Sequence, residues 1–516
     1  MTGIIRCVGW RSDALRRVAL TTLMALGLGA GPTGAVLAQT EPATGPSPEV
    51  NTGLLGRFIQ AYRDELNPPP PAEPPATPPA DAPLTRRPPP FPPAPLTQPP
   101  YPFTDWNYGG SSTIGASLPN QVVSPFMTAL RPTPVGQALH DAGIQIYGWV
   151  NVGGNISNAT VRRNGNFPAA YAYMPNTVQL NQFALYIERV PDTVQRDRID
   201  WGFRIANIYG TDYRYTTARG FFSQQYLRGN HQYGYDMPMA YGEVYIPWVA
   251  EGMVIRFGRY ISLPDIEAQL APNNYMYSHS MLYSVDPYTN TGVMSTVQLT
   301  RNWLVQLGIS NGNDVMPWQR NEPGNQASFT GCVRWNSDSS NDSVYACANT
   351  VNNQRWGYNN LNHYVGTWYH KFNERLHFAS EVYYMYQRDV PNVNVTGGSY
   401  EGTPYAGLRN PPNQAVCNTG ARCSANTFAA LAYLNYRISD MNNLSLRGEF
   451  FNDMQGQRFG YRTRYWAGAV GIQHWLSPSI LVRPEIAYYR ALDATPFNAG
   501  QRNDLIVLAA DVILRF

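Results

Sequence analysis

Charged side chains that could act together across a water-filled passage gather around one polar stretch, residues 261–291. The stretch opens with acidic residues in a plausible helical turn, and arginines stand at its base and in alternating segments before it. Facing rows of carboxylate and guanidinium groups set up a transverse field that sorts solutes by charge and polarity. The alternative is an ordinary external loop whose acids cap the helical turn. The candidate constriction residues are Arg204, Arg256, Arg259, Asp265 and Glu267.

Further charged residues occupy the polar positions of alternating segments, and their signs are mixed. Neighbouring segments could pair these charges with one another, so a purely structural role is at least as plausible for each residue. A channel selective for one ion sign needs one sign in excess, so the balance favours small neutral or zwitterionic solutes. The candidate lumen-facing residues are Glu188, Glu243, Glu381, Arg437, Arg447, Glu449, Arg483, Glu485 and Asp511.

Signatures of catalysis and of cofactor binding are missing from the sequence. The seven histidines are scattered, and the run Ser278-His279-Ser280 is not a catalytic constellation, because adjacent residues do not by themselves orient a nucleophile and a base. Neither GxGxxG nor GxxxxGK[ST] marks a nucleotide site. We therefore expect no enzymatic activity, no cofactor and no metal.

Four of the five cysteines form two close pairs, Cys332/Cys347 and Cys417/Cys423, and Cys7 lies in the N-terminal segment. An even number of cysteines in an exported chain suggests disulfides, and the spacings between these cysteines lack the CxxC signature of a zinc site. We expect two local disulfides, each within a polar, strand-free loop.

The first 38 residues are typical of a secretory signal peptide, with a positive start, the apolar run Val18–Ala30 and a small-residue cleavage site before Gln39. They hold four Arg and one Asp, so acidic and basic residues are equal in number in the remainder. A neutral chain argues against a nucleic-acid partner. After Ala38 no run of 18 apolar residues predicts a membrane-spanning helix.

Residues 39–103 form an arm that we expect to be periplasmic. Residues 54–66 predict a short amphipathic helix, and residues 67–103 hold 18 of the 43 prolines and predict an extended linker. The arm is either a passive spacer or a segment that brings the short helix to peptidoglycan or to another periplasmic partner. Residues 104–142 are a lead-in of uncertain structure.

From residue 143 onward, the chain shows period-2 alternation in segments of about ten residues, the length of a tilted membrane strand. Short and long gaps alternate between the segments, as periplasmic turns and external loops do in outer-membrane barrels. The segments are 143–153, 178–189, 198–209, 240–248, 253–260, 292–300, 302–310, 362–370, 375–387, 427–438, 443–452, 464–475, 479–490 and 505–516.

The composition favours a membrane barrel over a soluble sandwich. Aromatic residues make up 13% and charged residues only 14% of the chain, against about 25% charged in soluble proteins. The mean hydropathy is nevertheless −0.34. Only alternate residues face lipid in a barrel, which reconciles these values. We predict an all-β, antiparallel, up-and-down transmembrane barrel over 143–516 with fourteen strands, in a range of 12 to 16.

Several short sequence motifs lie close together between residues 255 and 293. They are Phe257-Gly258-Arg259-Tyr260, Ile266-Glu267, Asn273-Asn274, Tyr277-Ser278-His279-Ser280 and Pro287-Tyr288-Thr289-Asn290-Thr291-Gly292. This pattern resembles the OmpL-like β-barrel porins, over about residues 140–516. The resemblance implies a porin fold and an outer-membrane location, and it implies no particular ligand.

We therefore expect a bacterial outer-membrane porin in which small polar solutes diffuse passively through a water-filled lumen, narrowed by the 261–291 loop. The alternative is a structural or surface-interaction barrel with a closed or plugged lumen. The N-terminal region is too small for an autotransporter passenger, and the strands are too few for a TonB-type receptor. Expected partners are outer-membrane lipid, the barrel-assembly machinery and a small polar solute, with a homo-oligomer also open.

The last twelve residues predict a strand with one apolar face, which holds Ile506, Leu508, Val512 and Leu514. We expect this face to contact lipid, and the strand to close the barrel against 143–153. The terminal Phe516 resembles the aromatic signal that barrel-assembly machinery recognises. Deleting Phe516 should therefore reduce the folded fraction in the outer membrane, measured by heat-modifiable gel migration, far more than the single-channel properties of the molecules that do assemble. A normal folded fraction would contradict this role.

Overall fold

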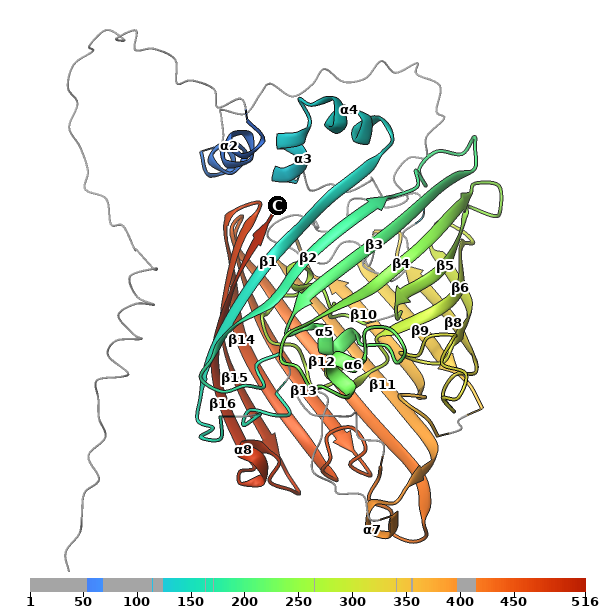
Figure 1. The fold of residues 1–516 in the computed structure, drawn as a ribbon, viewed down its shortest axis with the longest axis vertical. Helices are drawn as coiled ribbons and strands as arrows, with labels where there is room; N and C mark the ends of the chain where they lie inside the picture. Colours follow the sequence, from blue (N-terminus) through green and yellow to red (C-terminus); the bar gives the residue numbers. More distant parts are fainter. Residues whose placement is uncertain are drawn as a thin grey trace, which may run out of the picture. The chain divides into compact units, whose positions relative to one another are not determined.

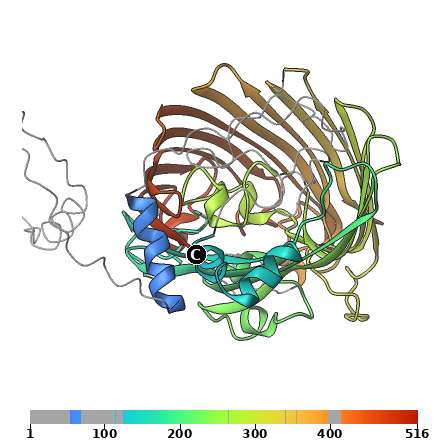
Figure 2. The ribbon, with the colours of Figure 1, turned by 90° about the horizontal axis from the view of Figure 1, so that it is seen from above.

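Sixteen antiparallel strands close into a barrel in the computed structural model (Figures 1 and 2). The structure describes residues 53–67, 114 and 124–516, apart from 163, 170, 264, 340, 354–355 and 397–413. Contacts divide the chain into Met1–Val50, which lies outside the described residues, and Asn51–Phe516, which holds the barrel. Each strand pairs with its neighbours in the chain, and the last strand pairs with the first. The predicted fold class is confirmed.

The strands alternate with short helical turns in the connections. The strands are β1 (Ile144–Ser157), β2 (Val178–Arg189), β3 (Asp200–Gly210), β4 (Gly234–Ile246), β5 (Met253–Ile261), β6 (Thr289–Gln298), β7 (Trp303–Asn311), β8 (Ala327–Asn336), β9 (Asp342–Val351), β10 (Asn362–Lys371), β11 (Leu376–Pro391), β12 (Arg422–Ser439), β13 (Asn442–Asp453), β14 (Thr463–Ser477), β15 (Ile480–Ala491) and β16 (Asp504–Arg515). The helices are α2 (Leu54–Leu66), α3 (Pro125–Leu130), α4 (Pro134–Asp141), α5 (Tyr213–Thr216), α6 (Gln224–Leu227), η1 (Ala271–Asn273), η2 (Tyr283–Val285), α7 (Val393–Thr396) and α8 (Phe497–Gly500).

Strand β16 shows how the period-2 pattern sets the two faces of the wall. Leu508 is 52% exposed on the outer face, whereas Asp511 is 2% exposed on the inner face. Successive side chains of a strand point to opposite faces, so the apolar column faces outward and the polar column points inward. Residues 149–157 of β1 pair with residues 507–515, and Phe516 donates its N–H to Gly148 O at 2.9 Å. The last strand therefore closes the barrel against the first, as predicted.

The expected count of fourteen strands is wrong, because the predicted gap at 311–361 contains β8 and β9. Their outer faces carry Gly331, Ala346 and Ala348 between larger residues such as Phe329 and Val344. Small outward residues weaken the hydrophobic alternation of the two strands. Because the hairpin turn between them is rich in Ser and Asn, the sequence of β8 and β9 resembles that of a polar loop. With sixteen strands, eight longer connections lie at one end and seven short turns at the other.

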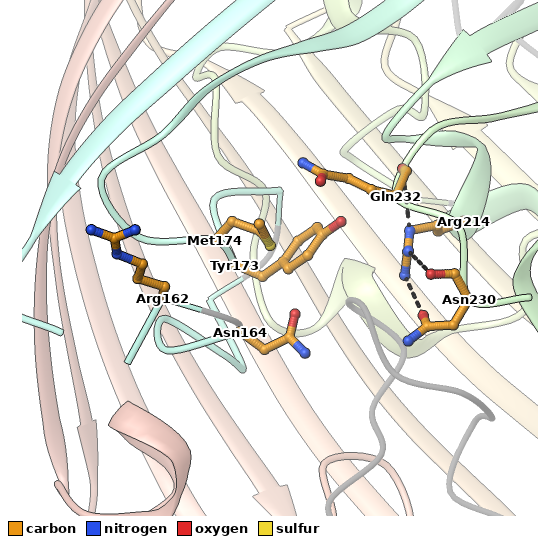
Figure 3. A pocket seen from close by; sticks show the side chains of 7 residues that line it. All are labelled: Arg162, Asn164, Tyr173, Met174, Arg214, Asn230 and Gln232. Atoms are coloured by element: carbon orange, nitrogen blue, oxygen red, sulfur yellow. Dashed lines mark hydrogen bonds between the residues drawn. The ribbon is translucent and has the colours of Figure 1, made fainter. Parts of the chain in front are cut away.

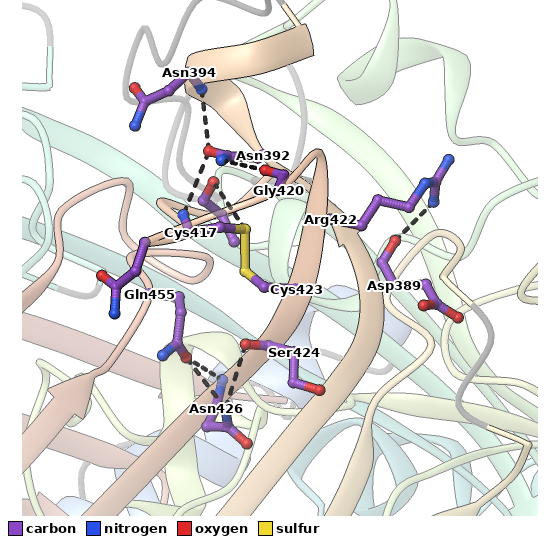
Figure 4. Close-up of a disulfide and its surroundings, with 12 residues drawn as sticks. Asp389, Asn392, Asn394, Cys417, Gly420, Arg422, Cys423, Ser424, Asn426 and Gln455 are labelled. Atoms are coloured by element: carbon purple, nitrogen blue, oxygen red, sulfur yellow. Dashed lines mark hydrogen bonds between the residues drawn. A yellow bond between two sulfur atoms is a disulfide. The ribbon is translucent and has the colours of Figure 1, made fainter.

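Both expected disulfides are present, but neither of them lies wholly in a loop. Cys332 and Cys347 are register partners on β8 and β9, so the expected strand-free setting is wrong for this pair. Cys417 and Cys423 tie the end of the β11–β12 loop to the start of β12 (Figure 4). Near the second bridge, Asn392 donates its side-chain N–H to Gly420 O at 2.8 Å.

The two ends of the barrel differ in the elements that they carry. The C-terminus lies at the same end as α3 and α4, whereas α7 and α8 lie at the other end, among the longer connections (Figure 1). Among the described residues, no helix combines the length and the apolar composition needed to cross a membrane.

The lead-in contains two short helices that the sequence interpretation left open. Ser124 and Thr133 accept hydrogen bonds from the N–H groups of Met127 and Gly136, and a proline follows each cap. Serine or threonine before proline is a frequent helix start, since the cap satisfies a free N–H and proline lacks one. The predicted signal peptide and, apart from Asn67, the proline-rich linker lie outside the described residues.

Helix α2 contacts the barrel at the end where the chain terminates. The Glu65 carboxylate accepts hydrogen bonds from the hydroxyls of Ser477 and Ser479, at 3.0 and 2.8 Å. The Tyr62 hydroxyl donates to the carbonyl of Arg515. The helix thus joins the turn between β14 and β15 to the last strand.

Candidate functional site

The connection between β5 and β6, residues 262–288, lies inside the ring of strands (Figure 2). We call it the inward loop. Its described residues are buried except Asp265 and Ala268, which are half-buried. Apolar side chains from along the loop join the main hydrophobic core of the barrel. They are Leu263, Ile266, Leu270, Ala271, Met276, Met281, Leu282 and Val285.

Glu267 is the most heavily bonded acid of the inward loop. Its carboxylate accepts hydrogen bonds from the N–H of Ser280 at 2.9 and 3.1 Å, from the Ser280 hydroxyl at 2.5 Å and from the Tyr433 hydroxyl on β12. The Arg447 guanidinium on β13 lies 3.8 Å away. Glu267 thus closes the loop on itself and also links it to the wall.

Strands β13 and β15 bind the middle of the inward loop. Arg447 donates to the Ser278 carbonyl at 2.8 Å and to its hydroxyl at 3.0 Å. The Ser278 N–H donates to the Glu485 carboxylate at 3.1 Å, and the Met281 N–H donates to Glu449 at 2.6 Å. Loop backbone groups buried away from water need such partners, and charged acceptors make strong ones.

Further contacts come from β15 and from β2. Arg483 donates to the carbonyls of Ala271 and Asn274 at 2.8 and 2.9 Å, while it pairs with Asp511 on β16. Gln182 on β2 donates to Gln269 O at 2.7 Å and accepts from the Ala271 N–H at 3.1 Å. A loop that starts on β5 is therefore bonded to strands on other parts of the wall.

The three predicted constriction arginines each have a carboxylate of the wall as partner. Arg204 pairs with Glu188 at 2.5 Å, and Arg256 pairs with Glu243 at 3.1 Å. Both are register pairs of adjacent strands. The cross-strand alternative therefore describes these two arginines, because directly opposite positions on one face bring the side chains together.

Arg259, the third predicted constriction arginine, lies at the base of the inward loop. It forms two hydrogen bonds with Asp236, at 2.9 and 3.1 Å, and donates to Thr216 O at 2.5 Å. The acids of the loop have different partners: Glu267 meets Arg447, and Asp265 lies beside Asp286. The expected array of loop acids against Arg204, Arg256 and Arg259 is therefore replaced by these pairs.

The remaining lumen-facing candidates lie on the inner face of the wall. Glu381, Glu449, Glu485 and Asp511 are buried there, and the half-buried Arg437 pairs with Asp440 in the turn after β12. Polar wall residues that also hold the loop were missed by the sequence interpretation. The alternation marks their face, but it does not indicate which of them meet the loop. These residues are Gln182, Tyr383, Tyr433 and Gln473.

His279 lies between aromatic rings and has no catalytic partner among its described contacts. Its ring stacks on Tyr171, with centroids 3.6 Å apart, and its Nε2 lies 2.9 Å from the Ala268 carbonyl. Burial lowers the pKa of His279 to about 3, so the ring is neutral. The hydroxyls of Ser278 and Ser280 bond to Arg447 and Glu267. The Ser-His-Ser run therefore holds the loop in place.

A separate cavity of about 330 Å³ lies among the connections β1–β2 and β3–β4 (Figure 3). Arg214 is fixed there by hydrogen bonds to the side chain and carbonyl of Asn230, at 3.1 and 3.2 Å. The cavity is lined by Arg162, Asn164, Tyr173, Met174, Arg214, Asn230 and Gln232.

A family model described as "beta-barrel porin-2, OmpL-like" matches residues 143–516. The chain belongs to this family. The match covers the whole barrel and leaves out the N-terminal arm and the lead-in, as the resemblance in the sequence predicted. None of the curated proteins matches the chain.

Solved structures that match this OmpL-like porin share little sequence with it. An anion-selective porin from Comamonas acidovorans has a TM-score of 0.45 and 8% identity, with 72% of this chain and 99% of that chain covered. The outer membrane channel DcaP of Acinetobacter baumannii has a TM-score of 0.44 and 9% identity, with 72% and 97% covered. The trimer form of OmpT from Vibrio cholerae has a TM-score of 0.41 and 8% identity, with 72% and 99% covered.

The short motifs that carry the family resemblance lie within the inward loop and at its two ends. Gly258 has a φ of +130°, and a Cβ atom there would lie 2.4 Å from the carbonyl oxygen of Ala240. Only glycine combines this backbone conformation with so close an approach. Arg259, Glu267, Ser278 and Ser280 supply contacts that hold the loop. In this OmpL-like porin, the motif therefore specifies how the loop enters the barrel and stays there.

Replacing Glu267 should loosen the inward loop. In a Glu267→Ala variant, the buried Ser280 and Tyr433 donors lose their acceptor, at a cost of about 1–3 kcal/mol of local stability. Hydrogen exchange followed by mass spectrometry should show faster exchange in peptides from 262–288. The control is Asp493→Ala, which removes an exposed partner of Arg464 and should leave these peptides unchanged. Equal exchange in both variants would contradict the anchoring role of Glu267.

Proposed function

We propose that this OmpL-like porin is an outer-membrane channel in which small polar solutes diffuse passively past the inward loop. The observation that carries the proposal is the bonding of this loop, which starts on β5, to β2, β15 and β13 across the barrel. A loop held there reduces the cross-section open to solutes. The proposal contains no catalytic step and no cofactor.

The pairing of inward charges supports a preference for neutral or zwitterionic solutes. Arg204, Arg256 and Arg259 each have a carboxylate partner, and Arg483 is paired with Asp511. A pair of opposite charges a few ångströms apart makes a local dipole with a weak field at longer range. Such a lining orients polar molecules without strongly favouring either ion sign.

The bacterial outer membrane is the location that best fits the molecule. A closed barrel satisfies its backbone hydrogen bonds internally, and apolar outer faces such as that of β16 suit a lipid environment. We include in the proposal export by the segment 1–38, recognition of Phe516 by the barrel-assembly machinery, a periplasmic arm and a homo-oligomer. A contact of the arm with peptidoglycan stays a prediction.

A second candidate is a barrel whose lumen is closed and whose external loops bind a partner. It is favoured by the degree to which the loop and the wall bury each other: Gln269, Ser280 and Met281 of the loop are fully buried, as are Asn435 and Ser445 of the wall. The two candidates differ in one property, which is ion flux through the folded protein.

Conductance in planar bilayers distinguishes them. The purified, folded protein should give discrete conductance steps, and deletion of residues 264–290 should enlarge each step, because the obstruction is removed. Shortening the β15–β16 connection at 493–501 is the control and should leave the step size unchanged. Absence of ion flux from protein shown to be folded by heat-modifiable migration would reject the channel. A step unchanged by the 264–290 deletion would reject the constriction.

A further inference from the structure

Three carboxylates that are far apart in the sequence meet where the inward loop contacts the wall. Asp265 and Asp286 belong to the loop, and Glu381 belongs to β11. Each offers one oxygen atom, and these three atoms lie within 4.8 Å of one another. Asp286 and Glu381 are 0% and 1% exposed, so water cannot readily solvate their charges.

Apart from a contact between the carboxyl groups of Asp265 and Asp286, most oxygens of this cluster have no hydrogen-bond partner. They are Asp265 Oδ1, Asp286 Oδ1, Asp286 Oδ2 and Glu381 Oε1. The other oxygen of Glu381 accepts the N–H of Ile266 at 2.8 Å, which fixes this side chain between the wall and the start of the loop. Unpaired buried carboxylate oxygens are costly, and a structure that keeps four together requires an explanation.

A neutral oxygen beside the cluster is also without a partner. The hydroxyl of Tyr283 is buried and makes no hydrogen bond among the described residues. Asp286 and Asp265 are the charged groups that act most strongly on this hydroxyl, which therefore lies near their carboxylates. The group is available as a further oxygen ligand.

The basic side chains of this region are directed elsewhere. Arg447 bonds to Ser278, and Arg458 donates to the carbonyl of Val285 and to the side chain of Asn359. The charges that act most strongly on Asp265 and Asp286 are those of neighbouring acids. Among the described contacts, none of the three acids meets a positively charged side chain, so a bound cation would balance their charge.

We propose that Asp265, Asp286 and Glu381 bind a hard divalent cation of the size of calcium, with the Tyr283 hydroxyl as a neutral ligand. Carboxylate and hydroxyl oxygens suit Ca²⁺, whose ligands lie at about 2.3–2.6 Å, so that opposite ligands are about 5 Å apart. Mg²⁺ requires shorter distances of about 2.0–2.1 Å and a stricter octahedron. The cation would fasten the inward loop to β11. Sequence spacing gave no sign of this site, because the ligands come from separate segments.

The proposal goes beyond solute passage, and its test does not depend on conduction. The full-length mature barrel is refolded in detergent free of lipopolysaccharide, which itself binds divalent cations, and is stripped with a chelator. Ca²⁺ is then titrated calorimetrically, and Tb³⁺ is titrated by tyrosine-sensitised luminescence with Ca²⁺ as competitor. We expect one Ca²⁺ per chain, displacement of Tb³⁺ by Ca²⁺ and a higher unfolding temperature with Ca²⁺ than with chelator.

Matched variants locate the binding. Asp265→Asn/Asp286→Asn and, separately, Glu381→Gln should weaken Ca²⁺ binding at least about tenfold, because affinity rises with the number of charged ligands. Asp493→Asn, which removes an exposed carboxylate of the β15–β16 connection, should bind like the unmodified chain. Folding of every variant is checked by heat-modifiable migration.

Three results would overturn the proposal. One is a folded, unmodified chain that binds neither Ca²⁺ nor Tb³⁺, which would mean that shared protons neutralise the acids. Another is undiminished Ca²⁺ affinity in both the double variant and Glu381→Gln. The third is tighter binding of Mg²⁺ than of Ca²⁺. If a variant fails to fold, the effect of chelator and Ca²⁺ on the unfolding temperature of the unmodified chain decides between a cation and shared protons.

Discussion

The need to give every buried polar group a partner governs how the inward loop sits in the barrel. The loop carries backbone N–H groups and carboxylates to buried positions, where an unpaired polar group costs about 1–3 kcal/mol. Charged side chains of the wall provide hydrogen-bond partners for these groups. Glu485 and Glu449 accept loop N–H groups, and Arg483 donates to two loop carbonyls. These wall residues, which the sequence pattern predicted to face the lumen, therefore hold the inward loop in place.

The same constraint explains why charge in the lumen is paired. Arg204 and Arg256 meet glutamates directly opposite on the next strand, since antiparallel register places such pairs within reach on one face. Arg447 serves two purposes, because it holds Ser278 and also lies beside Glu267. Loop anchoring and charge balance thus use the same residues, so a substitution that alters selectivity also alters the position of the loop.

The sequence predicted the parts of the fold that depend on local alternation. Strands such as β15 and β16 were recognised because large apolar residues alternate with charged ones, and their closure against β1 followed from the topology. Strands β8 and β9 were missed because small residues such as Gly331 and Ala346 occupy outward positions. The partners of Glu267 could not be predicted, since Tyr433 and Arg447 reach it only once the barrel has closed and the loop has crossed it. Local pattern fixes the face of a residue, whereas its partner depends on the path of the whole chain.

The central claim is that the middle of the inward loop is bound to β15. A chain with Ser278→Cys and Glu485→Cys tests it most directly, because the Ser278 N–H and the Glu485 carboxylate are 3.1 Å apart. Cysteine is shorter than glutamate, so a bifunctional methanethiosulfonate with a short spacer is used in place of a direct disulfide. This reagent should join the two cysteines of the folded protein, and the denatured, unreduced chain should migrate faster than its reduced form and than either single variant. Two cysteines that each bind a separate reagent molecule and form no cross-link would contradict the account, because the loop would then lie away from β15.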